Sequence, residues 1–290
     1  MNIPLPPDIE DDLLESCRNT GDYCPVMFEW YKYSARLANY FSCLELRSPA
    51  LIDISQIHNS VLIGLLNRCS RLMLANVTLS HEGAFGETTA ILDRCIFESA
   101  IKLIWLCHVK KEEYFNRFIA EGLKTEVELK KKIQENIANQ SGRVKAIEKQ
   151  MLNSIENYFK KSELSEETIE KLPKLPNIAQ MIEKNGSDRL AYIVGQRIGS
   201  HHVHGSWVSL WFHYLKEEDG IVSPWDHGCP THINQYAFVP LIVLEAIKAF
   251  LGFIIKYSEE SKILIEVIDG VSEEVRIFFH DITAQDIEII

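Results

Sequence analysis

The sequence lacks the sustained alternation of hydrophobic and polar residues that marks β-strands, and it has no internal repeat, no low-complexity tract and no glycine-rich phosphate loop. The missing loop argues against nucleotide binding of the P-loop or dinucleotide-binding kind. Hydrophobic residues instead recur at spacings of three and four along nearly the whole chain, which is the period of an α-helix. The sequence therefore predicts an all-α protein, folded as a multi-helix bundle.

Positive charge is also scarce. The chain has 30 lysines and arginines against 41 aspartates and glutamates, a formal net charge of -11. Proteins that wrap nucleic acid regardless of sequence need a broad basic surface to displace counterions. Here the basic groups at 130–132 and 143–149 alternate with glutamates, as on a solvated helix face. Any contact with RNA is therefore expected to be local.

The sequence indicates neither a disulfide framework nor a secretory signal. The cysteines are odd in number, widely spaced and mostly set in hydrophobic helical stretches: Cys17, Cys24, Cys43, Cys69, Cys95, Cys107 and Cys229. This usage fits reduced thiols in a cytosol. The first twelve residues are acidic and interrupted by prolines, whereas a signal peptide begins basic and continues hydrophobic. We expect a cytoplasmic protein.

One segment, 237–255, is about as long and hydrophobic as a membrane span. Glu245 and Lys248 lie in its middle, three residues apart, where they would be costly in lipid but can pair across a helix turn in a protein. We therefore expect a buried core helix and no membrane-spanning segment.

The helical pattern predicts three parts. Residues 1–24 form an N-terminal segment, 25–257 a helical bundle domain, and 258–290 two weaker C-terminal helices. Inside the bundle domain, about 112–172 forms a charged helical insertion.

The first fifty residues of that insertion carry a broken hydrophobic stripe and turn near Ser141-Gly142. We predict a long amphipathic arm, a helical hairpin over 112–161. It is our candidate surface for a dimer or for a partner protein.

The densest group of chemically active side chains lies at 196–207, which reads Q-R-I-G-S-H-H-V-H-G-S-W. In a continuous helix His201 falls about 40 degrees and His204 about 20 degrees from Arg197, whereas His202 falls about 140 degrees away. A guanidinium can hold a phosphate while a neighbouring imidazole moves a proton near neutral pH. His204 is the first candidate for proton transfer and His201 the second, with His202 a poorer one. Each imidazole can equally be a structural core residue.

The helix that carries this cluster is expected to run to about Lys216, with Gly199 and Gly205 as candidate kinks. A loop over 217–230 should follow. Its glycines and prolines suit a surface loop that covers a site as a lid or only connects two helices.

A second charged pair, Arg94 and Glu98, lies on the most hydrophobic helix of the first half, expected over 87–109. Opposite charges on such a face must pair with each other, with the histidines or with a ligand. Glu98 can orient an imidazole by accepting its second ring proton, and Arg94 can add positive charge for an anion. A purely structural ion pair explains both residues equally well.

Two sets of residues offer ligands to a metal: His201, His204 and Glu98 in the helices, or His227, Cys229 and His232 in the loop. The first set suits zinc or iron but is spread along the sequence, and the second lacks a clear fourth ligand. We expect no metal and no other cofactor.

Two blocks, L-D-R-C-I-F-E at 92–98 and S-H-H-V-H-G-S at 200–206, resemble the paired R-x-x-x-E and S-x-x-x-H-G-S features of an uncharacterised bacterial helical family, domain-of-unknown-function family 5677. The pattern extends over about 23–257. This resemblance implies a helical bundle without an established activity, and it adds Ser200 to the supporting residues of the site.

At a greater distance the chain resembles the HEPN superfamily, helical nucleotide-binding and ribonuclease folds whose motif is an arginine, four to six residues, then a histidine. Arg197 to His202 has the short spacing and Arg197 to His204 the long one. The resemblance implies metal-independent RNA cleavage at a composite site across a homodimer, often in toxin or antiviral systems. The chain departs from the pattern at Ile198, where those ribonucleases usually carry a polar residue.

Three functions therefore stay open. In a metal-independent ribonuclease, the ribose 2'-hydroxyl attacks its neighbouring phosphate while His204 moves the proton and Arg197 stabilises the charge on the phosphate oxygens. The alternatives are a non-catalytic helical dimer that binds a nucleotide or a protein partner through the same pocket, and a metal-dependent hydrolase.

Overall fold

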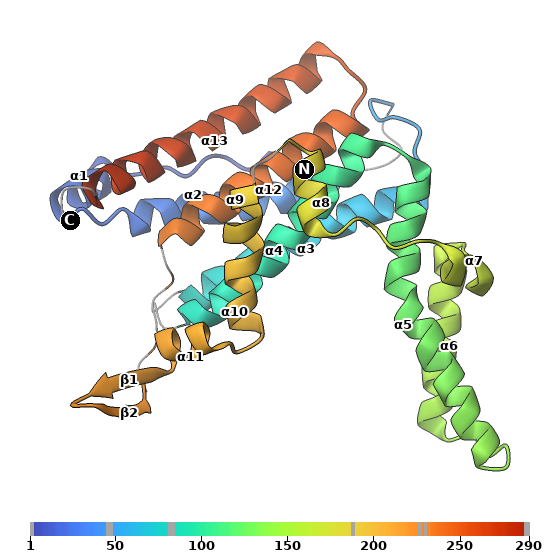
Figure 1. The fold of residues 1–290 in the computed structure, drawn as a ribbon. Coiled ribbons are helices and arrows are strands. Elements are labelled where there is room, and N and C mark those ends of the chain that lie inside the picture. Colours follow the sequence, from blue (N-terminus) through green and yellow to red (C-terminus); the bar gives the residue numbers. More distant parts are fainter. Residues whose placement is uncertain are drawn as a thin grey trace. The chain divides into compact units, whose positions relative to one another are not determined.

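A computed structural model describes residues 3–44, 49–80, 85–186, 189–225, 228, 231 and 233–286. Among the helices and strands of these residues, all are helices apart from one two-stranded hairpin (Figure 1). The predicted all-α, multi-helix fold is confirmed.

The chain divides into two compact units. One, here called the body, comprises Met1–Asp53, Leu62–His108 and Ile178–Ile290. The other, here called the arm unit, comprises Ile54–Val61 and Val109–Asn177. The N-terminal and C-terminal helices thus belong to the body.

Six longer helices build most of the body, the third of which starts in the arm unit: α1 (Asp11–Thr20), α2 (Cys24–Ser42), α3 (Gln56–Leu79), α4 (Gly86–Val109), α12 (Ile233–Ile254) and α13 (Glu259–Asp286). Local sequence sets where these helices begin. The Asp22 carboxylate accepts a hydrogen bond from the backbone N–H of Cys24 at 2.9 Å, and Pro25 occupies the first turn of α2.

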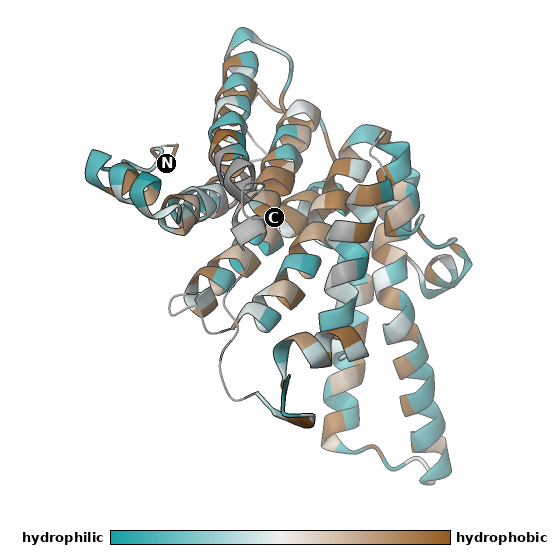
Figure 2. Ribbon diagram, turned by 60° about the vertical axis from the view of Figure 1, so that its left-hand side comes forward, coloured by the Kyte–Doolittle hydropathy of each residue, from teal (hydrophilic) through white to brown (hydrophobic). Residues whose placement is uncertain are grey.

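The core of the body forms around α12, which packs against α2 and α13. Hydrophobic residues gather in this interior (Figure 2). The segment Gln235–Ile254 is long and apolar enough to cross a membrane, but 56% of its most apolar window is buried inside the protein. It packs as a core helix. The expected pairing of Lys248 with Glu245 is wrong, because the Lys248 ammonium contacts the Asp269 carboxylate of α13 at 2.7 Å.

A single helix, α13, replaces the two C-terminal helices that we expected. Ile268, Val271 and Val275 are buried at spacings of three and four, so one hydrophobic face continues through the middle of the segment. Gly270 lies on this helix without breaking it.

A polar group is buried where α2, α3 and α4 meet. The Asn76 amide donates hydrogen bonds to the Tyr31 hydroxyl at 3.0 Å and to Oδ1 of Asp93 at 2.6 Å. Oδ2 of Asp93 is buried without a hydrogen-bond partner. Burial raises the pKa of Asp93 well above its ordinary value, although the Asn76 hydrogen bond opposes the shift.

The arm unit contains the predicted helical hairpin, formed by α5 (Glu112–Asn139) and α6 (Ala146–Ser162). Its turn includes Ser141 and Gly142, where the sequence predicted a turn. Both residues have positive φ. A short helix that we did not expect, α7 (Glu166–Lys171), buries Ile169 against α5. The Ser165 hydroxyl caps α7 by accepting a hydrogen bond from the N–H of Thr168.

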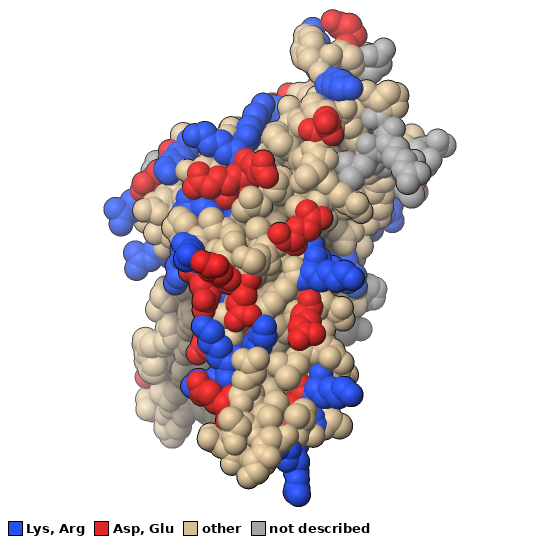
Figure 3. Space-filling model, turned by 90° about the vertical axis from the view of Figure 1, so that its right-hand side faces the viewer, with Lys and Arg blue, Asp and Glu red and all other residues tan. Residues whose placement is uncertain are grey.

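Charges of both signs alternate over the face shown in Figure 3. Lys130 forms an ion pair with Glu166 at 2.6 Å, and Lys131 pairs with Glu170. These two lysines are therefore balanced by carboxylates, as the sequence indicated for 130–132.

The prediction of one helix that continues to about Lys216 is wrong in detail. The chain forms four short helical segments and then a hairpin: α9 (Arg189–Tyr192), the π-helix η2 (Ile193–Ile198), α10 (Gly199–Val203), α11 (Trp207–His213), β1 (Leu215–Glu218) and β2 (Ile221–Pro224). Gly205 ends the helical path with a φ of 54°. Asp219 and Gly220 both have positive φ, at 52° and 75°, which is the requirement of a tight hairpin turn. The expected loop therefore begins as an antiparallel hairpin.

Candidate functional site

The candidate site forms where α4 contacts η2 and α10, two regions of the body whose contact the sequence left open. Gly195 and Gly199 face α4 at this contact. A Cβ on Gly195 would lie 2.5 Å from the Phe97 ring, and one on Gly199 would lie 2.9 Å from the Cβ of Arg94. Only a residue without a side chain allows the two backbones to approach this closely.

A polar network crosses the contact. Oε1 of Glu98 accepts hydrogen bonds from Nε of Arg94 at 3.3 Å and from the Gln196 amide at 2.6 Å. Nη1 of Arg94 donates to the Ser200 hydroxyl at 3.3 Å. The structure thus brings together three predicted site residues, Arg94, Glu98 and Ser200. Of the alternatives for the charged pair, it forms the ion pair, and within the described residues no hydrogen bond joins Glu98 to an imidazole.

Gln196 was missed by the sequence-based prediction. Its side chain is 9% exposed, and its Oε1 is buried without a hydrogen-bond partner. One signal was available, since Gln196 precedes Ser200 by four residues and so shares its helix face.

The π-helical turn places Arg197 at the surface. Such turns hold one more residue than an α-turn and occur frequently at functional sites. Arg197 is exposed, His201 is partly buried one turn later, and His204 is exposed in the turn that follows α10. The His204 N–H still donates to the carbonyl oxygen of Ser200 at 3.1 Å, so helical spacing extends to His204. Arg197, His201 and His204 thus follow one another at helical spacing, and their alignment as one stripe stays a prediction.

Within the part of the chain that the structure describes, no hydrogen bond or ion pair holds the side chain of Arg197 or of His204. The His201 side chain is held by a hydrogen bond, because its Nδ1 lies 2.7 Å from the Ser206 hydroxyl. This contact fixes the orientation of the ring and leaves Nε2 for another partner.

His202 lies away from the stripe, as its position in the helix predicts. Its Nδ1 is 3.4 Å from the Ser209 hydroxyl, and its ring centroid is 4.8 Å from that of His213. Burial, followed by the nearby His213 and His201, lowers the pKa of His202 to about 4. A neutral imidazole at pH 7 gives no charge for binding an anion.

His213 was also missed. It is 8% exposed, and neither ring nitrogen has a hydrogen-bond partner. Burial lowers its pKa, while the Glu87 carboxylate acts in the opposite direction. No pattern around His213 marked it as a neighbour of His202.

The described residues contain no group of three or more His, Cys, Asp or Glu side chains placed to hold a metal. His201, His204 and Glu98 therefore do not form such a group. The loop residues His227, Cys229 and His232 lie outside the described residues.

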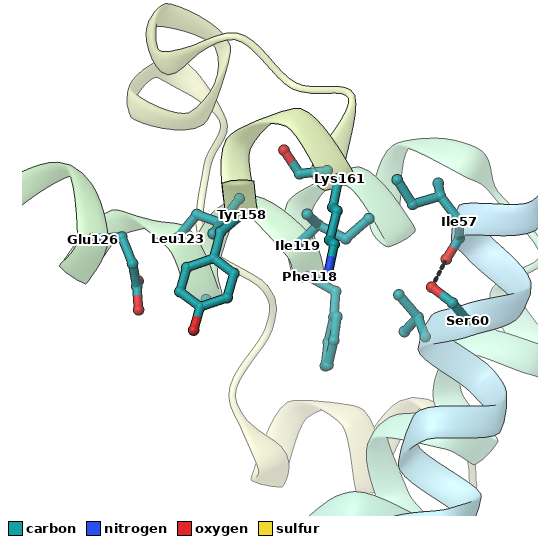
Figure 4. Close-up of a pocket in the computed structure, with 11 residues that line it drawn as sticks. Ile57, Ser60, Phe118, Ile119, Leu123, Glu126, Tyr158 and Lys161 are labelled. Atoms are coloured by element: carbon teal, nitrogen blue, oxygen red, sulfur yellow. Dashed lines mark hydrogen bonds between the residues drawn. The ribbon is translucent and has the colours of Figure 1, made fainter. Parts of the chain in front are cut away.

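The arm unit contains an open pocket of about 370 Å³ (Figure 4), which the sequence did not predict. Its lining is mostly hydrophobic and comes from α3, α5 and α6: Ile57, Ser60, Val61, Phe118, Ile119, Gly122, Leu123, Glu126, Tyr158, Lys161 and Ser162. Oε2 of Glu126 is buried without a hydrogen-bond partner. Hydrophobic walls with one unpaired carboxylate oxygen are features of a ligand site.

Comparison with known proteins gives one match. No curated protein and no solved structure matches the chain, and the resemblance to the HEPN superfamily stays a prediction. A family model described as a family of unknown function (DUF5677) matches residues 59–222, which is more than half of the chain. The matched stretch includes α4, η2 and α10 with all of the residues of the candidate site. The chain therefore belongs to the DUF5677 family of unknown function.

Proposed function

We propose that the body binds RNA locally and cleaves it without a metal, at the stripe formed by Arg197, His201 and His204. One observation carries the proposal. An exposed guanidinium stands one helical turn from an imidazole whose ring is fixed by Ser206 and whose Nε2 is left for another partner. Together they supply an anion-binding group and a proton-transfer group near neutral pH.

In this mechanism the 2'-hydroxyl of a ribose attacks the neighbouring phosphorus. The O2'–P bond forms as the P–O5' bond breaks, which leaves a 2',3'-cyclic phosphate and a 5'-hydroxyl. His204 takes the proton from the 2'-hydroxyl, and His201 gives one to the leaving oxygen. Arg197 stabilises the negative charge that develops on the phosphate oxygens.

The network behind the stripe positions these groups. Glu98 and Ser200 hold Arg94, whose side chain is 18% exposed. Arg94 adds a second positive charge near the stripe, partly neutralised by Glu98.

The wider setting is proposed with the activity. A cytoplasmic location is supported by the free cysteines among the described residues: Cys17, Cys24, Cys43, Cys69, Cys95 and Cys107. A place in a bacterial toxin or phage-defence system rests on the HEPN resemblance alone.

The test is incubation of the purified protein with labelled RNA, with and without a chelator, and with a 2'-deoxy analogue. We expect chelator-resistant cleavage of RNA and none of the analogue. Arg197→Ala and His204→Ala should each abolish cleavage with the fold intact, whereas Arg276→Ala, an exposed arginine of α13, should leave it unchanged. Full activity in the Arg197 or the His204 variant would refute the mechanism. Loss of wild-type activity in chelator would favour a metal-dependent hydrolase.

A non-catalytic helical module is the second candidate. It is favoured by the ion pair between Arg94 and Glu98, which already neutralises one of the two guanidinium groups at the site. In that case wild-type protein cuts nothing, yet it binds a nucleotide that Arg197→Ala no longer binds.

A further inference from the structure

An extended hydrophobic surface lies just after the candidate site. Helix α11 and the hairpin that follows expose large hydrophobic side chains, here called the aromatic face: Trp207, Val208, Leu210, Trp211, Phe212, Tyr214, Ile221, Val222 and Trp225. Trp207 is 68% exposed and Ile221 70%. On α11 only Ser209 and His213 are buried.

The size of this face decides how it should be interpreted. Aromatic side chains present about 150–250 Å² each, so these exposed fractions correspond to on the order of 800–1,000 Å². The largest hydrophobic patch on a typical monomer is roughly 300–600 Å². A stable protein interface takes about 800 Å² from each partner. Ile221 and Val222 are neighbours in β2 and point to opposite sides of the hairpin, so one partner covers only part of this area. The total exposed hydrophobic area is nevertheless large for a free surface.

The hairpin gives an independent reason for a partner. Among the described residues, β1 and β2 pair only with each other, and most of their residues are exposed. An isolated two-stranded hairpin is marginally stable in water and needs packing on one face. Its open edges also leave backbone groups ready to pair with another strand.

The charge distribution favours a second copy of this chain as the partner. Helix α11 contains no lysine, arginine, aspartate or glutamate. Two copies of a chain with a net charge of -11 can therefore meet at this face without like charges opposing each other. The acidic residues lie at the tip of the hairpin, over 217–219, where an interface has its polar rim. The same acidic tip and the lack of cations on α11 disfavour RNA.

We propose that the aromatic face is the interface of a homodimer of this chain. Trp207 and Trp211, whose rings stack at 5.4 Å, form the ridge at its centre. The second copy then lies next to the candidate site, because Ser206 both precedes α11 and contacts His201. The inference does not depend on the proposed RNA cleavage. It also moves the dimer surface away from the helical arm, where the sequence had suggested it.

The oligomeric state of the full chain tests the proposal, measured by analytical ultracentrifugation over a micromolar concentration series. Wild type should be a dimer, and Ile221→Glu and Phe212→Glu should each raise the dimer dissociation constant by on the order of 100-fold or more. The matched control is Ile147→Glu on α6, an isoleucine that is 58% exposed on the arm, and it should remain a dimer. Circular dichroism spectra should coincide for all four proteins, because the substituted side chains are exposed.

Four results would overturn the proposal. One is a monomeric wild type, and another is a dimer that Ile221→Glu and Phe212→Glu leave intact. The third is dissociation by Ile147→Glu alone, which would assign the interface to the arm. Loss of RNA binding in Phe212→Glu with an unchanged dimer would assign the aromatic face to RNA instead.

Discussion

The contact between Gly195 and Phe97 gives the sharpest test of the site's architecture. In Gly195→Ala the new Cβ would lie 2.5 to 2.8 Å from three carbons of the Phe97 ring. Phe97 is 2% exposed, and its ring stacks on Phe238 at a centroid distance of 5.6 Å, so it has little room to turn away. Either the ring leaves its position or η2 moves away from α4.

The expected magnitude follows from two opposing effects. Overpacking of a core costs about 1–3 kcal/mol. Replacing glycine by alanine inside a helix contributes about 1 kcal/mol in the other direction. Since contacts of 2.5 to 2.8 Å are severe, the overpacking cost should lie in the upper part of its range, about 2–3 kcal/mol. We therefore expect a net loss of roughly 1–2 kcal/mol in the free energy of unfolding, measured by urea denaturation. The hydrogen bond from Gln196 to Glu98 should weaken at the same time, because both depend on the same approach of the helices.

The matched control is Gly252→Ala in α12, where an added Cβ meets nothing within 4 Å. This variant should gain about 0.5–1 kcal/mol, since it only removes glycine's backbone freedom. In Gly195→Ala combined with Phe97→Leu, the two effects should be less than additive, because the smaller side chain leaves room for the methyl group. If Gly195→Ala is as stable as wild type, the close packing of η2 on α4 is refuted.

Two titratable groups give further predictions. Because burial raises the pKa of Asp93 in the folded state, its carboxyl costs stability as the pH rises from the unfolded value of 3.8 through the folded pKa; Asp93→Asn, which cannot ionise, should remove that part of the pH dependence of unfolding, and an unchanged pH dependence would contradict the assignment. For His202, a folded pKa of about 4 lies below the unfolded value of 6.5, so its contribution to stability is present above pH 6.5 and is lost as the pH falls toward 4. His202→Gln should remove part of that loss, and NMR titration should show the His202 ring still neutral at pH 5.5; a ring that titrates near pH 6.5 would contradict its burial.

Helix positions in this chain follow from hydrophobic spacing. The period of three to four predicts α4, because burial of one face decides where it forms. The turn of the arm follows instead from Ser141-Gly142, residues that favour a turn. The prediction of two C-terminal helices is wrong for α13, because its buried face continues through Ile268, Val271 and Val275. Local propensity is a weak guide where packing against another helix decides the outcome.

The hairpin has a sequence signal, its turn residues, that a search for helical periodicity does not detect. Asp219-Gly220 is a strong two-residue turn, flanked on one side by Ile221 and Val222, which favour strands. Charged residues at 216–218 gave no strand alternation, so the turn was assigned to a loop. The π-helical turn has no sequence signature of comparable strength, because it depends on how Gly195 and Gly199 fit against α4.

The sequence identified several residues of the site but not the contacts between them. Arg94 and Glu98 were identifiable as charges on a hydrophobic helix, and Ser200 from its place in the histidine block. The hydrogen bond of Gln196 to Glu98 joins residues 98 positions apart. The roles of Ser206 and His213 depend on the break at Gly205, which turns α11 back toward α10.

The π-helical turn has a consequence for how relatives of this chain should be aligned and redesigned. Removing one residue from 193–198 would convert the π-helical turn into an α-helical turn. The part of the helix before the deletion would rotate by about 100 degrees relative to Ser200 and His201. If the residue removed lies between Gln196 and Ser200, Gln196 no longer faces Glu98 while Ser200 faces Arg94. An alignment gap placed in this stretch would therefore pair residues that occupy different faces of the helix.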